Sequence, residues 1–278
     1  MSHPLRLDAP AKLNLSLRIV GRRDDGFHLL ESEMVLLDLA DRLLLMPGCS
    51  GLRVDGAAAG VPLGEANLAW RGLRAGLDAG PDLACLALEK RIPPAAGLGG
   101  GSSDAGAAWR LGRAWRGAAT TPTPDELRGL SHIGADVPFF AAGVAAARVS
   151  GIGETVEARS AARRHVVLVH PPFGLSTADV FAELRADEWG TLENDLLAPA
   201  RRLRPALDDL FAQVASAGGV PRLSGSGPTV FSLEDDADRA VAVARAVADS
   251  GVHATISRTR TAPATIERVD EEDPSEHP

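Results

Sequence analysis

Residues 93–105 read PPAAGLGGGSSDA, and this stretch indicates the fold more directly than any other part of the chain. Its four glycines and two serines stand immediately before residues 104–115, whose small and straight-chain residues are typical of a helix. Glycine lets the backbone approach a ligand closely and adopt positive φ, so successive N–H groups can point at one anion. The positive end of the helix dipole lies at the same place. The stretch therefore predicts a phosphate-binding loop.

Two common phosphate-binding motifs do not match this stretch. No Gly-Lys-Ser/Thr follows the glycines, so it is not a P-loop, and the third glycine of G-x-G-x-x-G would fall on Ser102. A flexible linker is the structural alternative. Linkers, however, are not normally bounded by a Pro-Pro pair on one side and a strong helix on the other.

A second glycine-rich segment, LSGSGPT at residues 223–229, leads into a predicted strand at 229–233. It does not match the G-x-S-x-G nucleophile elbow of hydrolases. Taken alone it is a plain turn. Together with the first loop it becomes a candidate second wall of a phosphate site.

Outside the two loops, the pattern of apolar residues predicts a mixture of strands and helices. Residues 13–19 (LNLSLRI) alternate apolar and polar side chains, as a half-buried strand does, and a charged, glycine-bounded turn follows at 21–26. Residues 27–37 are strand-like or mixed in pattern, further strands are expected at 43–46, 52–54, 166–169, 229–233 and 253–258, and a regular element of either type at 83–91 ends before Pro93. Helices are expected at 67–77, 104–115, 123–131, 177–184, 195–217 and 236–249. This order predicts an α+β fold.

The length of 278 residues favours two domains. The short basic stretch at 159–164 precedes an apolar strand, so we expect an N-terminal domain at 1–158 and a C-terminal domain at 159–268. Residues 269–278 hold five acidic residues and no Lys or Arg, and predict a disordered acidic tail. Without that tail the net charge changes from −8 to −3.

Composition excludes several classes of protein. With 45% apolar and 24% charged residues the chain is neither fibrous nor wholly disordered, and it carries no basic patch of the kind that binds nucleic acid. No apolar run is long enough to span a membrane, and charges at Arg6, Asp8 and Lys12 argue against a signal peptide. Cys49 and Cys85 lack metal-ligand spacing and are expected to be separate buried thiols. A cytoplasmic protein without an obligate protein partner is the expectation.

Two charged residues outside the glycine loops are candidates for chemistry. Lys12 lies at the start of the first predicted strand, and Asp136 lies in an apolar context, GADVPFF, where an unpaired carboxylate is costly to bury. An ion pair between them would remove that cost and could be purely structural. Beside a phosphate loop, however, a lysine that neutralises charge and a carboxylate that accepts a proton are the parts that phosphoryl transfer requires.

Three segments together resemble the three motifs of the GHMP kinases. They are residues 10–15 (PAKLNL) with the 21–28 turn, residues 93–105, and residues 222–231. The similarity also covers 134–138, 174–177 and 194–196, and so extends over nearly the whole chain except the tail. Within the family, the motifs are most similar to those of kinases that act on 4-diphosphocytidyl-2-C-methyl-D-erythritol.

The resemblance implies a fold, a reaction and a location for the site. The N-terminal domain would be like domain 2 of ribosomal protein S5 and the C-terminal domain ferredoxin-like, with the active site in the cleft between them. ATP with Mg²⁺ would phosphorylate the 2-hydroxyl of the cytidyl diphosphate substrate, a step in the synthesis of isoprenoid precursors by the non-mevalonate route.

The resemblance also implies roles for individual residues. Asp136 would be the general base and Lys12 its charge-stabilising partner. Asn14 would contact the erythritol, and Phe27, His28 and Thr177 would line the cytidine pocket. Asn67 and Lys90 would lie near the adenine, and either Ser102 or Ser103 near Mg²⁺. The loop that would surround the triphosphate comprises Pro93, Pro94, Ala95, Ala96, Gly97, Leu98, Gly99, Gly100, Gly101, Ser102 and Ser103.

One departure from the family pattern concerns the cytidine pocket. The family usually has tyrosine where this chain has Phe27, and the chain contains no tyrosine at all. Phenylalanine keeps a stacking face and loses the hydroxyl. Two alternatives stay open: another small-molecule kinase of the same family, acting on homoserine or mevalonate, and a nucleotide-binding regulator that does not catalyse transfer. The aromatic residue next to His28 favours a nucleobase over a small aliphatic alcohol.

Overall fold

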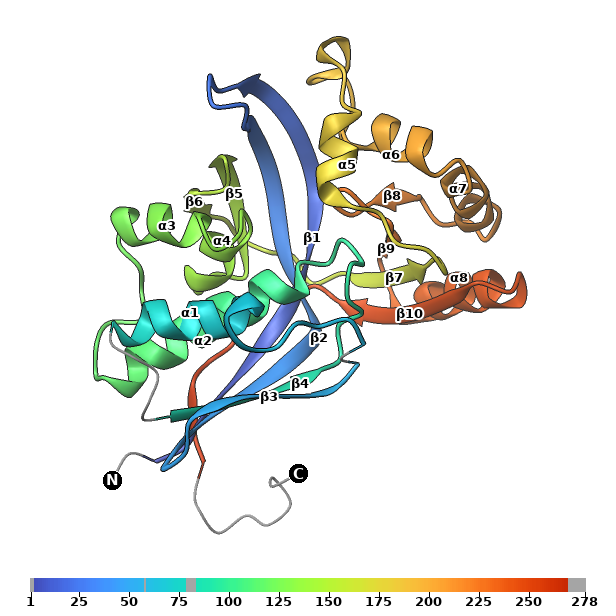
Figure 1. The fold of residues 1–278 in the computed structure, drawn as a ribbon. Helices are drawn as coiled ribbons and strands as arrows, with labels where there is room; N and C mark the ends of the chain where they lie inside the picture. The colour runs from blue at the N-terminus through green and yellow to red at the C-terminus, as the bar shows by residue number, and fades with distance from the viewer. Residues whose placement is uncertain (1–2, 58, 79–83, 270–278) are drawn as a thin grey trace.

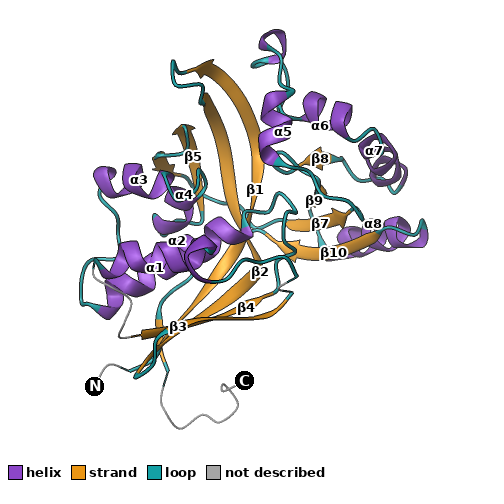
Figure 2. Cartoon of the chain, in the orientation of Figure 1, coloured by secondary structure: helices purple, strands orange, loops and turns teal. Residues whose placement is uncertain are grey.

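A computed structural model describes residues 3–57, 59–78 and 84–269. Its strands form two sheets, one of seven strands and one of four, with helices packed on both (Figures 1 and 2). This arrangement confirms the predicted α+β class. The chain passes from the first sheet to the second between β6 (Thr155–Ala158) and β7 (His165–His170), and returns to the first at β11 (Glu267–Arg268). The domain limits themselves stay a prediction.

The first sheet is built on a long antiparallel hairpin of β1 (Leu5–Arg22) and β2 (His28–Pro47). The strand order is β11-β1-β2-β4-β3, in which β3 (Gly51–Gly56) and β4 (Ala84–Lys90) run parallel. The N-terminal half of β2 also pairs with β5 (Ala146–Gly151), which in turn pairs with β6. Helices α1 (Leu68–Leu77), α2 (Gly100–Trp115), α3 (Pro124–Ser131) and α4 (Val137–Ala141) belong to this part of the chain.

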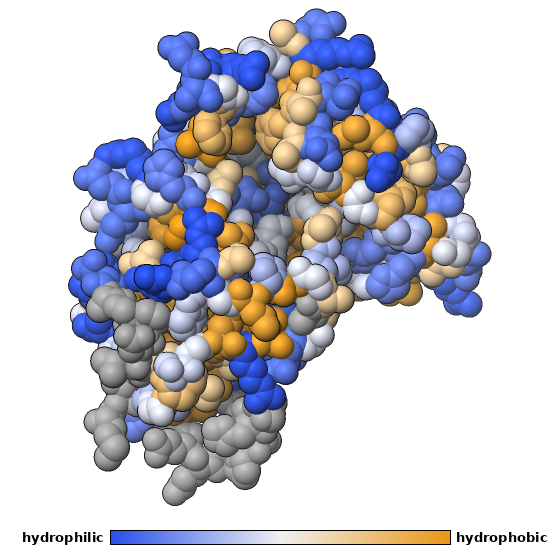
Figure 3. Space-filling view, in the orientation of Figure 1, coloured by the Kyte–Doolittle hydropathy of each residue, from blue (hydrophilic) through white to orange (hydrophobic). Residues whose placement is uncertain are grey.

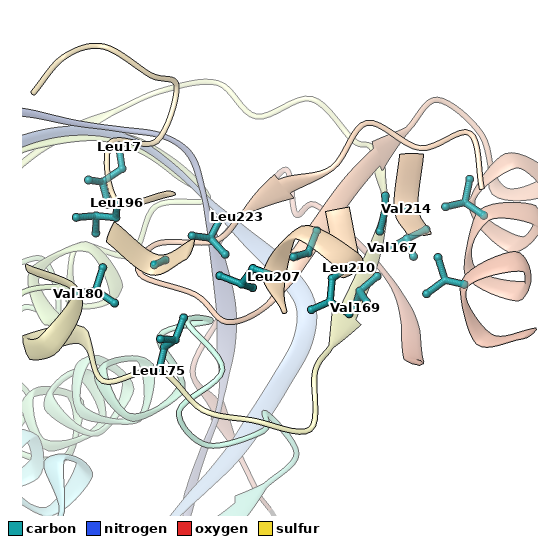
Figure 4. Packing of buried hydrophobic residues seen from close by; sticks show 14 of the residues in the cluster. Leu17, Val167, Val169, Leu175, Val180, Leu196, Leu207, Leu210, Val214 and Leu223 are labelled. Carbon is teal, nitrogen blue, oxygen red and sulfur yellow. The ribbon is translucent and has the colours of Figure 1, made fainter. Parts of the chain in front are cut away.

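The second sheet has the order β10-β7-β9-β8 and is antiparallel throughout. Its other strands are β8 (Arg222–Leu223), β9 (Val230–Glu234) and β10 (His253–Arg258), and its helices are α5 (Thr177–Ala182), α6 (Leu197–Leu203), α7 (Leu207–Ser216) and α8 (Ala237–Asp249). A buried apolar cluster joins these elements to the hairpin. In Figure 4, Leu17 of β1 lies with Leu196 and Val180 at one end of that cluster.

The hairpin is therefore shared by the two halves of the molecule. Leu17 of β1 exchanges backbone hydrogen bonds with residues 193 and 195, at 2.8 and 2.9 Å, and the Leu36 carbonyl of β2 accepts a hydrogen bond from Arg260 at 2.8 Å. The hairpin therefore connects the two sheets through backbone hydrogen bonds and the shared apolar cluster.

Most predicted elements are present, but several differ in extent. Strand β1 begins at Leu5 and not at 13, so Lys12 lies within the strand and not at its start. The segments at 27–37 and 43–46 are one strand, β2, of 20 residues. The helix expected at 195–217 is broken into α6 and α7 around Pro205, which cannot continue a helix. Helix α2 begins at Gly100, four residues earlier than expected. Strands β5, β6, β8 and β11 and helix α4 were not predicted.

The expectation of two separate buried thiols is wrong. Cys49 and Cys85 form a disulfide, with Cα atoms 5.2 Å apart, and Cys49 is exposed. The parallel pairing of β3 with β4 explains their proximity, because Gly51 lies opposite Cys85 and Cys49 precedes it by two residues. Such pairing across 36 residues of sequence is not visible in the spacing of the cysteines.

No helix within the described ranges has both the length and the apolar character needed to cross a membrane. The predicted acidic tail lies outside the described residues except for Val269, whose backbone N–H donates to the Pro4 carbonyl at 3.0 Å.

A half-buried histidine predicts how stability changes with pH. His170 ends β7, its Nε2 lies 2.9 Å from the Thr255 hydroxyl, and its ring centroid lies 5.3 Å from that of His253. Burial, and next the charge of His253, lower the pKa of His170 to about 4. The unfolded chain, with an ordinary imidazole pKa of about 6.5, binds more protons between these values. The free energy of unfolding should thus fall as pH drops from 6.5 towards 4, by up to about 3 kcal/mol from this residue.

Urea unfolding of wild type and His170→Asn at a series of pH values between 4 and 7 measures this contribution. We expect the difference in unfolding free energy between the two proteins to change across that window, and His132→Asn, at an exposed site, to follow wild type. Parallel curves for wild type and His170→Asn would contradict the assignment.

Candidate active site

A cavity of about 570 Å³ lies between the two halves of the molecule, within the range of small-molecule sites. Figure 3 shows the surface hollowed between the part that carries α5 and α6 and the part that carries α1 and α2. Strands β1, β2 and β4 of the first sheet line it, together with α5 and the second glycine segment from the other half of the chain. The predicted site residues on its wall are Lys12, Asn14, Asn67, Lys90, the loop residues from Pro93 to Ser102 inclusive, Asp136 and Thr177.

The first glycine loop has the backbone conformation of an anion cradle. Ala95, Gly97 and Gly99 have φ of 53°, 75° and 72°, so left-handed residues occupy every second position. Such alternation turns successive N–H groups towards one point. Helix α2 then begins at Gly100 without a side-chain cap, which leaves the N–H groups of its first turn without partners in the helix. Loop and helix together present a surface of N–H donors to the cavity.

The second glycine segment lies directly against the first. The Ser224 hydroxyl donates to the Gly97 carbonyl at 3.0 Å, and the Thr229 N–H donates to the Ala96 carbonyl at 3.3 Å. The contact needs a glycine at position 97, since a Cβ there would lie 2.6 Å from the carbonyl oxygens of Ser224 and Gly227. Gly225 also lines the cavity. The segment therefore lines the cavity beside the first loop, and its role at a phosphate stays a prediction.

Lys12 and Asp136 meet on the cavity wall. Their Nζ and Oδ2 atoms are 3.3 Å apart, with the lysine side chain 5% exposed and the aspartate side chain 28%. The backbone N–H of Lys12 donates to the Leu98 carbonyl at 2.9 Å, which joins β1 to the glycine loop. Asp136 stands at the start of α4 and makes no capping hydrogen bond there; Pro138, in the first turn, has no N–H to offer. Its carboxylate is therefore available to Lys12 and to a ligand.

Asn14 and Thr177 reach the same cavity from opposite halves of the molecule. The Asn14 Oδ1 accepts a hydrogen bond from Lys12 Nζ at 2.5 Å, while the Thr177 hydroxyl shares a hydrogen bond of 2.8 Å with that of Ser226. A ligand that touches both would therefore lie across the space between the two sheets.

Lys90 is held by two carboxylates at the back of the glycine loop. Its Nζ pairs with Asp41 and, at 2.7 Å, with Asp104 of α2. Burial acts to lower the pKa of Lys90, but Asp104 and Asp41 together hold it above its usual value. Burial, reinforced by Asp41 and opposed by Lys90, raises the pKa of Asp104 well above its ordinary range. The Asp41 carboxylate also accepts the N–H groups of Arg91 and Ile92, so this cluster anchors both ends of the loop.

Asn67 is largely engaged by its own helix. It caps α1 by accepting the Ala69 N–H at 2.8 Å, and its amide donates to the Pro62 carbonyl at 2.7 Å. One N–H of that amide is left for a ligand. Asn67 and Lys90 thus mark one end of the cavity, although most of their polar atoms are bound within the protein.

Three predicted site residues do not line the cavity. Ser103 is 1% exposed and its hydroxyl donates to the Pro10 carbonyl at 2.7 Å, so it faces β1. Phe27, at the tip of the hairpin, is 60% exposed. The His28 ring packs on Phe181, which does line the cavity, at 5.4 Å between centroids, and on Trp189 at 5.8 Å. Burial, and next Arg22, lower the pKa of His28, which favours the neutral ring.

Sequence reasoning missed two polar residues that shape the site. Asp41 is fully buried and holds the start of the glycine loop, as described above. Asn194 donates to the Leu223 and Gly225 carbonyls at 2.9 and 2.8 Å and so fixes the second glycine segment. The available signal was a polar residue in an otherwise apolar stretch, which for Asp41 is LADRLLL at residues 39–45.

The first turn of α2 carries side-chain oxygen atoms of the kind that could act as ligands to a nucleotide-bound Mg²⁺. Within the described part of the chain no three His, Cys, Asp or Glu side chains cluster as metal ligands, so most ligands would have to come from phosphates and water, as is usual for this ion. Ser102 lines the cavity, and the buried Oδ1 of Asp104 beside it has no hydrogen-bond partner. Both atoms would serve as oxygen ligands, and of the two serines only Ser102 lines the cavity.

Comparisons with known proteins agree with this geometry. Residues 67–144 match the model of the GHMP kinases N terminal domain, and residues 178–253 match that of the GHMP kinases C terminal domain. The 4-diphosphocytidyl-2-C-methyl-D-erythritol kinase of Dinoroseobacter shibae is 40% identical over 87% of this chain and 90% of its own length. The enzyme of the same name from Geobacter metallireducens is 36% identical over 88% and 95%, respectively.

Solved structures show the same fold. A crystal structure of 4-(cytidine 5'-diphospho)-2C-methyl-D-erythritol kinase superposes with a TM-score of 0.76 at 33% identity, covering 91% of this chain and 98% of that one. Homoserine kinase from Cytophaga hutchinsonii superposes with a TM-score of 0.70 over 96% and 98%, at only 16% identity, and shows the likeness of fold alone.

Proposed function

Because this chain belongs to the GHMP kinases, and within them to the 4-diphosphocytidyl-2-C-methyl-D-erythritol kinases, we propose that it phosphorylates the 2-hydroxyl of 4-diphosphocytidyl-2-C-methyl-D-erythritol with ATP. The observation that carries the chemistry is the Lys12–Asp136 pair, 3.3 Å apart, on the wall of the cavity that the glycine loop also lines. The glycine loop, the Lys12 ammonium and the Asp136 carboxylate thus line the same cavity.

In the proposed reaction the substrate 2-oxygen attacks the γ-phosphorus of ATP. A new O–P bond forms, the bond between the γ-phosphorus and the β,γ-bridging oxygen breaks, and ADP leaves with that electron pair. Asp136 accepts the proton of the hydroxyl, and Lys12 stabilises the negative charge that develops on the transferred group. The loop N–H groups hold the phosphates in line with the attacking oxygen, because such positioning supplies much of the catalysis in phosphoryl transfer.

The two ends of the cavity suit the two ends of the ligand pair. We assign the nucleotide to the side of Asn67 and the glycine loop, and the erythritol to Asn14 beside Lys12. The cytosine is assigned to the side of His28 and Phe181, whose rings pack together and offer an aromatic stacking surface. Phe27 would join it only if the exposed tip of the hairpin bent towards the ligand.

Mg²⁺ bound with ATP would supply positive charge that offsets the charge of the phosphates. The Ser102 hydroxyl would be a ligand to it from the protein, and the unpartnered Oδ1 of Asp104 would be the second oxygen nearby.

Turnover with defined alcohols tests the proposal. We expect ADP release from ATP with 4-diphosphocytidyl-2-C-methyl-D-erythritol as acceptor, and rates near background with homoserine or mevalonate, which have nothing to occupy the aromatic end of the cavity. The product should carry its new phosphate on the 2-oxygen, as ³¹P NMR can establish. Turnover with homoserine or mevalonate alone would reject the substrate, and ATP binding without turnover of any alcohol would favour a regulator.

A further inference from the structure

Ser32 of β2 lies behind the Lys12–Asp136 pair, away from the cavity. It is 1% exposed, and its hydroxyl makes two hydrogen bonds. It donates to the Ser16 carbonyl at 2.6 Å and accepts from the Asn14 Nδ2 at 2.8 Å. The register of β1 and β2 shifts between Asn14 and Ser16, an irregularity that brings one hydroxyl within reach of both.

These two hydrogen bonds determine the orientation of the Asn14 amide. A hydroxyl has a single hydrogen, and here the Ser16 carbonyl takes it, so Ser32 can only accept from Asn14. The amide must then turn its NH₂ group to Ser32 and its oxygen to Lys12 Nζ, where the 2.5 Å hydrogen bond is found. The reverse orientation would set an NH₂ group against an ammonium, two donors facing each other.

We propose that Ser32 is a positioning residue for the phosphoryl transfer, acting on Lys12 through Asn14. With the Asn14 oxygen on one side and the Asp136 carboxylate on the other, the buried ammonium is fixed beside the carboxylate. Hydrogen bonds to charged groups are stronger than neutral ones, so losing this orientation frees Lys12 to leave its place. The inference rests on the proposed function, in which Lys12 and Asp136 act on the transferred group.

A purely structural role for Ser32 predicts different behaviour. In that case the hydroxyl serves only to satisfy the buried Ser16 carbonyl, and its loss lowers stability without depending on Asn14. If Ser32 acts through Asn14, its effect on turnover must disappear once the Asn14 amide is gone. A double-mutant cycle separates the two cases.

We expect Ser32→Ala to lower kcat about tenfold, the loss of roughly one hydrogen bond to a charged group, with the KM for ATP within twofold of wild type. Ser32→Thr, which keeps the hydroxyl, should restore kcat to within about threefold. Ser32→Cys replaces the hydroxyl with a thiol, which is a poor hydrogen-bond acceptor of nearly the same volume, and should lose as much activity as Ser32→Ala. It therefore tests the proposal even if the alanine variant folds badly. In the Asn14→Ala background, Ser32→Ala should change kcat by less than twofold.

An unchanged kcat in Ser32→Ala, or an equal loss in the presence and absence of the Asn14 amide, would overturn the proposal. The ¹⁵N resonance of the Asn14 amide reports on the hydrogen bond without any turnover, and it should move in Ser32→Ala and return in Ser32→Thr. If it does so while wild type fails to phosphorylate the cytidyl substrate, the proposed function is wrong and the orientation of the amide stands. If wild type is active and the resonance does not move, the orienting role is wrong.

Discussion

Replacing Asp136 with alanine is expected to lower kcat by at least about a hundredfold while leaving the affinity for ATP nearly unchanged. In the proposed reaction the carboxylate takes the proton of the attacking hydroxyl, and general-base catalysis contributes about 10²–10⁴-fold. The proposed nucleotide site, in contrast, consists of the N–H groups of the glycine loop and the first turn of α2, and Asp136 makes no side-chain capping hydrogen bond at its own helix, α4. The loss should therefore fall on the chemical step.

Steady-state kinetics with the cytidyl substrate, together with calorimetric titration of an ATP analogue, measure both quantities. Asp136→Asn should behave like the alanine variant, because an amide keeps the shape but cannot accept the proton. Asp125→Ala is the matched control, an exposed aspartate paired with Arg128 on the surface of α3, and should retain wild-type kcat. An Asp136→Ala variant that keeps its turnover would exclude this residue as the base.

The sequence was most informative where the chemistry is local. A phosphate cradle needs glycines at neighbouring positions before a helix, so residues 93–105 predict one directly, and the structure places positive φ at Ala95, Gly97 and Gly99. Asp136 could be singled out because a carboxylate in an apolar stretch needs a partner, and its ion pair with Lys12 supplies one. The second glycine segment was recognised as a companion of the first for a similar reason.

Features that depend on pairing distant segments could not be predicted in this way. Cys49 and Cys85 are joined only because β3 and β4 run side by side. Strand β5 is recognisable mainly through its pairing with β2, since Ala146 and Ala147 in it have little strand preference. The role of Asp41 depends on backbone N–H groups 50 and 51 residues away, which no short-range pattern records.

The side chains of the predicted cytidine pocket show the limit of transferring roles by motif. Phe27 and His28 are neighbours in the sequence, yet Phe27 is exposed at the hairpin tip whereas His28 packs against Phe181 and Trp189. Successive residues of an extended chain point to opposite sides, so one motif sends its two rings in different directions. The partner rings come from the second half of the chain and were not identified as part of the site.

Replacing Gly97 with alanine is expected to lower kcat/KM for ATP by about a hundredfold or more. Gly97 has φ of 75°, and an added Cβ would lie 2.6 Å from two carbonyl oxygens of the second glycine segment. The strain of the left-handed backbone costs alanine about 1–2 kcal/mol, and the contact with backbone atoms can be relieved only by moving the two loops apart. That movement breaks the hydrogen bond from Ser224 and displaces the N–H groups of the cradle, and a misplacement of about 1 Å is enough for such a loss.

Gly129→Ala is the matched control, because Gly129 lies in α3 with nothing within 4 Å of an added Cβ, and alanine there should leave turnover unchanged. Thermal unfolding of both variants separates a rearranged loop from a protein that fails to fold. If the Gly97→Ala variant binds ATP and turns over like wild type, the two segments do not need to touch. The first loop alone would then determine the conformation of the cradle. The contact between Gly97 and the second glycine segment would have no part in catalysis.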